Sequence, residues 1–283
     1  MRIVDPVLRA VLNRFGKERG ARWIGQWAEI AGIDLLGLAH RRMGIMKYQN
    51  MEETGEEYLV RGVLPRLLAK PSPVLLDVGA NVGEFSRLLR AQFPSARIQA
   101  FEPVPATFDR LRKNMEGLDV RCLNFGLGAT EETVPIYLSS RAELNPLASL
   151  YPAVAKSIHR FPETVAEMIR IRTLDAVAAE QKTDFIDLLK VDAEGHEFAV
   201  LQGGLGLIRS NRVGAVLFEF NEMNTVSKVF LRDFYETLAG YRFYRLDSRR
   251  LIPLGGYQPR NEIFQFQNVL AVHSALHPTE EWT

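Results

Sequence analysis

Polar and acidic residues stand at the ends of five short apolar stretches of this chain. They are Asp77 and Asn81 after the first stretch, Glu102 after the second, Asn124 after the third, Asp192 and Glu194 after the fourth, and Glu219 and Asn221 at the fifth. In an open α/β sheet the carboxyl ends of the strands form the ligand crevice, so we expect these side chains to share one site. Their carboxylates and amides could bind hydroxyl or cationic groups and accept protons.

The first apolar stretch, residues 74–78, leads directly into a turn bracketed by Gly79 and Gly83. Glycine permits a positive φ and close approach of a ligand, and the N–H groups of a helix that begins near Gly83 can face a polar ligand. Asn81 occupies the position of the second glycine in the dinucleotide-binding pattern Gly-x-Gly-x-x-Gly, and the third glycine is missing. The turn predicts a nucleotide-like ligand, with an ordinary strand-to-helix turn as the alternative.

Glu102 and Asp77 occupy the positions that predict the most specific contacts. Glu102 lies 19 residues after Gly83, where an acidic side chain can accept hydrogen bonds from both hydroxyls of a ribose. The alternative is that Glu102 supplies negative charge at the start of the next helix. Asp77 ends a buried strand, where an unpaired charge would be costly, so it needs turn N–H groups or a cationic ligand group such as an α-amino group.

Alternating strands and helices must position these residues. From Val74 onward, short apolar stretches alternate with helical periodicity, which predicts a parallel sheet with helices on both faces. The predicted strands are 74–78, 97–101, 120–125, 185–191, 213–220, 242–246 and 268–273, and the predicted helices are 84–93, 106–115, 174–179, 197–208 and 227–238. Residues 133–138 are expected to prolong the edge of this sheet at its third strand, and residues 169–172 to form a further strand.

A helical extension is expected to precede the α/β domain. Residues 6–16 and 20–40 show helical spacing of apolar side chains, and a further helix is predicted at 56–68. Trp23 and Trp27 lie one helical turn apart and predict a buried face, covered either within the monomer or by a second subunit in a homodimer.

These patterns divide the chain into an extension, residues 1–70, and a domain, residues 71–283. The domain contains a long stretch without clear periodicity at 139–167. It holds the pairs Asn145-Pro, Tyr151-Pro and Phe161-Pro, and it is too long for a simple connection. We predict that this stretch is a lid or a loop that binds the acceptor substrate.

Four short motifs occur in order within residues 74–222. They are Asp77-Val-Gly-Ala-Asn-Val-Gly-Glu-Phe-Ser86, Phe101-Glu-Pro-Val-Pro-Ala-Thr-Phe108, Arg172-Thr-Leu-Asp175 and Leu189-Lys-Val-Asp-Ala-Glu-Gly-His-Glu197. Together they resemble the FkbM family of S-adenosylmethionine-dependent methyltransferases, and four coupled motifs are more specific than any one. The resemblance implies the Rossmann-like class I methyltransferase fold, with a seven-stranded, mostly parallel sheet. It also implies O-methylation of a hydroxyl on a sugar, glycan or secondary-metabolite acceptor.

The resemblance also implies which residues bind S-adenosylmethionine. It assigns the methionine part of the cofactor to Asp77, Gly79, Asn81 and Gly83, the ribose to Glu102, and the border of the adenine to residues near Asn124. Asp192 should lie nearest the cofactor, because it ends the strand beside the first one. Residues 1–55 lie outside the motifs and inherit no role.

Methyl transfer to a hydroxyl requires in-line positioning of donor and acceptor and removal of a proton. We expect Asp192, Glu194 and His196 to be the catalytic residues. His196 titrates in a range useful for a general base, with a helix-capping or surface histidine as the alternative. His159 in the long stretch is another candidate base.

Asp192, Glu219 and Asn221 could instead bind Mg²⁺. Carboxylate and amide oxygens suit this hard cation, which would acidify an acceptor hydroxyl. The same spacing would also serve to cap the end of the sheet, so both interpretations stay open.

Composition limits the class of protein, the partners and the cellular location that we expect. The 283 residues are 47% hydrophobic and 24% charged, which is typical of a globular chain with one large domain and an appendage. The net charge of +1 gives no argument for binding nucleic acid. A single cysteine excludes an internal disulfide, and no stretch approaches the ~20 apolar residues of a membrane span, so we expect a cytoplasmic protein. Residues 1–50 carry nine Lys or Arg against four acids, which favours a solvated helical face, with weak peripheral contact to an anionic membrane as the alternative.

Two other functions remain open at this point. An NAD-dependent oxidoreductase of Rossmann type would share the acid after the second strand, but it requires the third glycine that this turn lacks. A non-catalytic module would bind the cofactor without turnover. The presence of Glu194 and His196 argues mildly against such a module.

Overall fold

The computed structural model describes residues 17–46, 50–68, 70–140 and 147–275. The described chain forms two compact units, divided between Met43 and Gly44. The expected boundary at residue 70 therefore falls inside the second unit, after a helical stretch that packs on its sheet.

Over its described residues, 17–43, the first unit contains two helices, α2 (Lys17–Ile30) and α3 (Leu35–Arg42). The helical extension is thus confirmed over this range, with the stretch 20–40 divided between the two helices. The chain turns after α2, and Asp34 begins α3 by accepting the N–H of Gly37 at 2.9 Å from its Oδ1 atom. The helix predicted at 6–16 lies outside the described residues.

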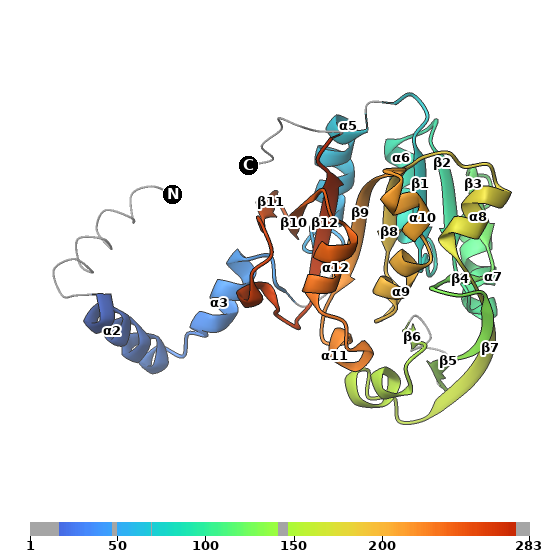
Figure 1. Cartoon of the computed structure of the whole chain (residues 1–283). Coiled ribbons are helices and arrows are strands. Elements are labelled where there is room, and N and C mark those ends of the chain that lie inside the picture. The colour runs from blue at the N-terminus through green and yellow to red at the C-terminus, as the bar shows by residue number, and fades with distance from the viewer. Residues whose placement is uncertain (1–16, 47–49, 69, 141–146, 276–283) are drawn as a thin grey trace. The chain divides into compact units, whose positions relative to one another are not determined.

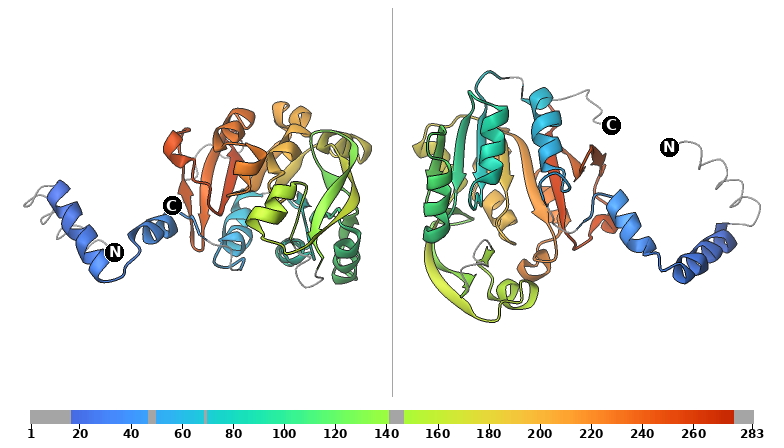
Figure 2. Two further views of the ribbon diagram at one scale, coloured as in Figure 1. Left: turned by 90° about the horizontal axis from the view of Figure 1, so that it is seen from below. Right: turned by 180° about the vertical axis from the view of Figure 1, so that it is seen from behind.

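The second unit is built on an eight-stranded sheet between two layers of helices (Figures 1 and 2). Its strand order is β11-β10-β12-β9-β8-β1-β2-β3. The five strands β9, β8, β1, β2 and β3 are paired in parallel, and the pairs β9–β12, β12–β10 and β10–β11 are antiparallel. The strands are β1 (Val74–Val78), β2 (Arg97–Phe101), β3 (Val120–Leu123), β8 (Ile186–Val191), β9 (Val213–Phe220), β10 (Tyr241–Asp247), β11 (Arg250–Pro253) and β12 (Gln267–His273). The predicted seven-stranded, mostly parallel sheet is confirmed, and β11 adds an eighth strand that was not predicted.

Two apolar clusters attach the helices to the two faces of this sheet. Leu76 of β1 belongs to the cluster on one face and Leu75 to the cluster on the other, because successive side chains of a strand point in opposite directions. The first face is covered by α8 (Leu174–Glu180), α9 (Glu197–Gln202), α10 (Leu205–Arg209) and α12 (Leu231–Thr237). The opposite face is covered by α4 (Glu56–Tyr58), a π-helical turn at Leu59–Val63, α5 (Leu64–Leu67) and α6 (Glu84–Gln92), and α7 (Pro105–Asn114) packs at its β2–β3 end.

Two of the predicted helices are each divided in the structure. The stretch 197–208 is interrupted by Gly203 and Gly204, which are poor helix formers. The stretch predicted at 227–238 is divided between α11 (Asn224–Ser227) and α12, because Lys228 has a left-handed φ of 58° that ends α11.

A second sheet lies beside the carboxyl ends of the parallel strands (Figure 1). It has the order β4-β7-β5-β6, with β4 (Gly126–Leu127), β5 (Glu132–Ser139), β6 (Ala148–Ser149) and β7 (Thr164–Arg172). The prediction that residues 133–138 prolong the main sheet is therefore wrong, because β5 pairs along its whole length with β7. The stretch 139–167 contains β6, a π-helical turn at Val154–Ile158 and the start of β7, while residues 141–146 lie outside the described residues.

Candidate active site

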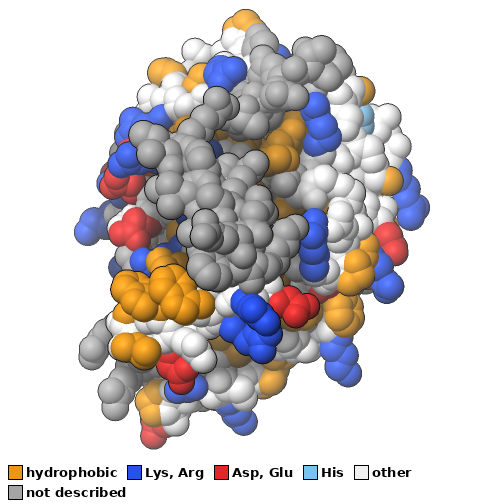
Figure 3. All heavy atoms as spheres, turned by 90° about the vertical axis from the view of Figure 1, so that its left-hand side faces the viewer, with side chains coloured by type: hydrophobic (Ala, Val, Ile, Leu, Met, Phe, Trp, Pro, Cys, Tyr) orange, Lys and Arg blue, Asp and Glu red, His pale blue; other side chains and the backbone are white. Residues whose placement is uncertain are grey.

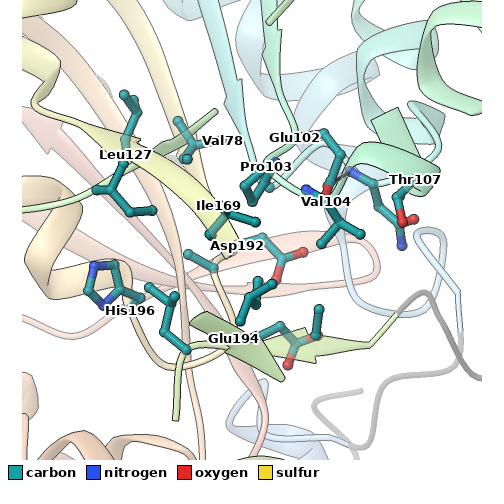
Figure 4. Close-up of a pocket in the computed structure, with 18 residues that line it drawn as sticks. Val78, Glu102, Pro103, Val104, Thr107, Leu127, Ile169, Asp192, Glu194 and His196 are labelled. Atoms are coloured by element: carbon teal, nitrogen blue, oxygen red, sulfur yellow. Dashed lines mark hydrogen bonds between the residues drawn. The ribbon is translucent and has the colours of Figure 1, made fainter. Parts of the chain in front are cut away.

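A cavity lies between the carboxyl ends of β1, β2 and β8 and the second sheet. Six of the predicted site residues line it: Gly79, Asn81, Glu102, Asp192, Glu194 and His196. In the view of Figure 4, Asp192 lies between Glu102 and His196. The other walls are largely aliphatic and include Val104, Leu127, Ile136, Leu150, Ile169 and Ile171.

Three predicted cofactor-binding residues do not line this cavity. Asp77 is fully buried within β1. Gly83 has a φ of 90° at the start of α6 and packs against α7, since a Cβ there would lie 2.7 Å from the Leu111 side chain. Asn124 is exposed, and its amide donates hydrogen bonds to the carbonyl oxygens of Glu102 (3.0 Å) and Pro103 (3.2 Å). These three residues shape the strand ends that carry the cavity.

Glu102 connects the loop after β1 to the loop after β2. Its Oε2 atom accepts the N–H of Asn81 at 3.0 Å, and its Oε1 atom accepts the N–H of Val104 at 2.9 Å. Asn81 has a left-handed φ of 48°, so this bond helps to hold a strained turn. Burial raises the pKa of Glu102 to about 7, with the two N–H donors opposing the rise. Each carboxylate oxygen keeps a second lone pair that a ligand hydroxyl could use.

Lys190 is a functional residue that the sequence analysis missed. It lies in β8 directly opposite Asp77 of β1, and its Nζ atom is 3.4 Å from Asp77 Oδ1 and 3.2 Å from Asp192 Oδ2. Asp77 also accepts a hydrogen bond from the Ser86 hydroxyl at 2.7 Å. Burial by itself lowers the pKa of Lys190, but the carboxylates of Asp192, Asp77 and Glu56 outweigh burial and raise it above its ordinary value. The cation beside Asp77 is therefore supplied by the protein.

A turn held by Glu197 carries the predicted catalytic residues. The Glu197 Oε1 atom accepts the N–H groups of Ala193 (2.9 Å) and Gly195 (3.0 Å). Within this turn Glu194 and Gly195 have φ values of 52° and 97°. Glu197 is buried, and burial raises its pKa to about 7. Sequence reasoning gave Glu197 no role, although an acid two residues after a glycine turn is placed to bind turn amides.

The two candidate proton acceptors of this turn differ in their surroundings. Burial raises the pKa of Glu194, although His159 opposes the rise with its Nε2 atom 3.4 Å from Glu194 Oε2. Burial lowers the pKa of His196 to about 4, and its Nδ1 atom lies 3.3 Å from the Tyr151 hydroxyl. The expectation that His196 titrates near neutral pH is therefore wrong, because burial of the ring lowers its pKa by more than the charge of Glu132 raises it.

The residues considered for Mg²⁺ do not form a metal site. Within the described residues, no three His, Cys, Asp or Glu side chains are placed to hold a metal ion. Asn221 Oδ1 accepts the N–H of Met223 at 2.7 Å, and its amide nitrogen donates to Glu219. Burial and neighbouring carboxylates raise the pKa of Glu219 well above its ordinary value. These contacts fit the alternative in which both residues cap the end of β9.

Comparison with known proteins gives a family match over much of this domain. The chain matches the methyltransferase FkbM domain over residues 77–243, which is more than half of its length. It is 35% identical over 156 residues to the methyltransferase sdnD of Sordaria araneosa, an alignment that covers 47% of this chain and 60% of that protein. The chain is also 29% identical over 161 residues to the 2-O-methyltransferase NoeI of Sinorhizobium fredii, covering 52% of this chain and 63% of NoeI.

Two further similarities extend this comparison. The chain is 29% identical over 158 residues to the hexuronic acid methyltransferase AglP of Haloferax volcanii, covering 55% of this chain and 59% of AglP. The chain thus spans about three-fifths of the length of these curated relatives. A crystal structure of a methyltransferase FkbM from Methylobacillus flagellatus matches with a TM-score of 0.46 and 13% identity, over 78% of this chain and 50% of that one.

Proposed function

The chain belongs to the FkbM methyltransferase family, and from this membership we propose that it transfers a methyl group from S-adenosylmethionine to a hydroxyl oxygen. The observation that carries the proposal is the cavity at the carboxyl ends of β1, β2 and β8, where Asn81, Glu102 and Asp192 meet. The family match removes the support for an NAD-dependent oxidoreductase. A non-catalytic module would share the family and the cavity, so turnover must be measured separately.

The residues of the cavity fit such a cofactor. Glu102 has free lone pairs on both oxygens toward the ribose hydroxyls, and the backbone at Gly79 and Asn81 allows close approach. The Asp192 side chain is 37% exposed and has one oxygen bonded to Lys190, which leaves the other for a polar or cationic group of the ligand. When bound, S-adenosylmethionine supplies an electrophilic methyl group.

We assign the proton acceptor to Glu194. It lines the cavity, and burial raises its pKa, which makes its carboxylate a stronger base. His159 positions this carboxylate from behind. His196 stays neutral above about pH 4, so we assign it a positioning role as a hydrogen-bonding partner of Tyr151 at the cavity wall.

We propose that the acceptor presents its hydroxyl beside apolar surface. The second sheet contributes Ile136, Leu150, Ile169 and neighbouring aliphatic residues to the cavity, and these side chains favour a secondary metabolite or the apolar face of a sugar. The relatives NoeI and AglP are named for methyl transfer to a 2-O position and to hexuronic acid, which supports a hydroxyl on a glycan as the second acceptor class.

Calorimetric titration tests the cofactor. We expect the intact protein to bind S-adenosylmethionine and not NADH. The variant Glu102→Gln should weaken binding about tenfold to hundredfold, because a hydrogen bond to a charged group is worth roughly 1.5–3 kcal/mol. Glu116→Gln is the matched control, since Glu116 is exposed just after α7. Absence of binding at millimolar cofactor by folded protein would refute the proposal.

Transfer of a labelled methyl group onto a panel of hydroxylated metabolites, sugars and lipid-linked glycans tests the chemistry. We expect Glu194→Gln to lower kcat about 10²- to 10⁴-fold, the usual contribution of a general base, with little change in cofactor affinity. Glu236→Gln, at an exposed position of α12 in the same unit, is the control. Cofactor binding without turnover on any acceptor would identify the non-catalytic alternative.

A further inference from the structure

The first unit exposes an unusual number of large hydrophobic side chains. Seven of them lie between Trp23 and Leu38, with 39–86% of each side chain exposed. Over the described residues of the second unit, only four comparable side chains are exposed. Isolated exposed apolar residues are normal on a protein surface, whereas a contiguous group of them marks a site of interaction.

The exposed residues form one face on α2 and continue into α3. Trp23, Trp27 and Ile30 follow helical spacing and are 62%, 58% and 86% exposed. Basic residues lie on the same two helices, with Arg19 one turn before Trp23 and Arg41 in the last turn of α3. Figure 3 looks from the side of these helices and shows hydrophobic side chains gathered beside Lys and Arg side chains.

Charge indicates what covers this face. Residues 1–43 contain eight Lys or Arg against four Asp or Glu, whereas residues 44–283 contain 27 against 30. The first unit is therefore positive and the remainder negative. A second copy would bring two positive faces together, while an anionic lipid surface attracts this unit. Tryptophan also favours the boundary between lipid headgroups and acyl chains.

We propose that residues 17–43 dock on the surface of an anionic lipid bilayer, with Trp23, Trp27 and Ile30 inserted among the headgroups. Short amphipathic helices with basic residues and exposed tryptophans bind in the plane of the interface. Along the described ranges, no helix is both long and apolar enough to cross a bilayer, which agrees with docking at the surface. This inference is independent of the methyl acceptor.

Vesicle binding by the full chain tests the proposal directly. The chain has three tryptophans, so the variant Trp282→Phe leaves only Trp23 and Trp27 to report. Vesicles of equal phosphatidylglycerol and phosphatidylcholine should shift the tryptophan emission to the blue and sediment the protein, whereas pure phosphatidylcholine should bind it weakly. Binding should fall between 0.1 and 1 M NaCl, as the Debye length shortens from about 10 to about 3 Å.

Variants then assign the contact to individual residues. In sedimentation with anionic vesicles, Trp23→Ser with Trp27→Ser should lower binding at least tenfold for each tryptophan removed. Arg19→Gln with Arg22→Gln should lower it roughly fivefold for each charge and reduce the salt dependence. Met168→Ser is the matched control, because Met168 is 60% exposed in the second unit.

The proposal is overturned if anionic vesicles bind no better than neutral ones, or if the tryptophan variant binds like the Met168 control. It is also overturned if sedimentation equilibrium without lipid shows a dimer that the tryptophan variant dissociates, since the face would then be covered by a second copy. Unchanged circular dichroism and cofactor affinity show that each variant remains folded. If the tryptophan variant does not fold, the arginine variant tests the proposal independently.

Discussion

Replacing Lys190 with methionine removes a cation that contacts both Asp77 and Asp192. Methionine keeps an unbranched side chain of similar length, so the change mainly deletes charge. Lys190 Nζ lies 3.4 Å from Asp77 Oδ1 and 3.2 Å from Asp192 Oδ2, and only 8% of the lysine side chain is exposed. The two carboxylates differ, because the Asp77 side chain is completely buried and that of Asp192 is 37% exposed.

The expected loss of stability comes mainly from Asp77. Water can solvate Asp192 in the variant, whereas Asp77 would keep only its hydrogen bond from the Ser86 hydroxyl. Removing one partner of a buried ion pair costs about 3–5 kcal/mol, because it leaves an uncompensated charge. A typical domain is stable by about 5–15 kcal/mol, so Lys190→Met should remain folded in many conditions but with a much lower unfolding midpoint.

Urea denaturation followed by circular dichroism measures this loss, and a double variant separates charge from packing. Lys190→Met with Asp77→Asn removes both charges and retains an oxygen that can accept the Ser86 hydroxyl. We expect it to recover most of the lost stability, since replacing both partners of a buried pair is often nearly neutral. A loss below about 1 kcal/mol in the single variant, or a double variant as unstable as the single one, would refute the assigned ion pair.

Two further predictions concern the same strand ends. Gly79→Ala should abolish cofactor binding and strongly destabilise the second unit, because a Cβ at this φ of 74° would lie 1.7 Å from the Asp192 carbonyl oxygen. Gly256→Ala is the control in the same titration and unfolding assays, because a Cβ there has no atom within 4 Å. Equal cofactor affinity and equal stability of the two variants would contradict this geometry. Burial raises to about 7 the pKa of three glutamates, namely Glu56, Glu102 and Glu197. The folded state therefore holds protons between about pH 4.5 and 7 that the unfolded state has released, and stability falls as pH rises through this window. His196 opposes this trend by roughly 0.4 kcal/mol between pH 6.5 and 8, because its pKa is lowered to about 4 in the folded state while the unfolded state still binds protons just above pH 6.5. Between pH 6.5 and 8 each glutamate should then remove roughly 0.8 kcal/mol of unfolding free energy; urea midpoints measured across this range check it, and a midpoint that rises with pH would contradict it.

Three strands of the main sheet were predicted with the bounds that the structure has, and the fully buried strands β8 and β12 were predicted to within one residue. The ranges 74–78, 97–101 and 213–220 agree with β1, β2 and β9, because a strand buried on both faces is a continuous apolar stretch that ends at Pro, Gly or polar residues. Strand β5 has no such signal. Its residues change from exposed at Glu132 to buried at Ser139, and nothing in its sequence says whether it pairs with β3 or with the distant β7.

The candidate site was predictable to the level of strand ends. Glu102, Asp192 and Glu194 do line one cavity, as expected for residues that follow parallel strands. The partner of Asp77 was not predicted, because turn N–H groups or a cationic ligand group were expected there, and the structure places Lys190 beside it. The available signal was Lys190, a lone base in an otherwise largely apolar strand, whose neighbour across the sheet becomes known only once β1 and β8 are placed in register.

Two acids of this region hold the backbone of neighbouring turns. Glu102 binds the backbone of Asn81 and Val104, and Glu197 binds the backbone of Ala193 and Gly195. Most of the carboxylate oxygens of Glu102 and Glu197 therefore hold backbone turns in place. Lys190 balances the negative charge of Asp77 and Asp192 nearby. Such cross-connections hold the rim in place before a ligand arrives, which reduces the ordering that binding would require. Replacing one of these carboxylates should therefore loosen the loop that it binds as well as the loop that carries it. The losses of stability from variants at Glu102 and at Asn81 should then be coupled and not additive.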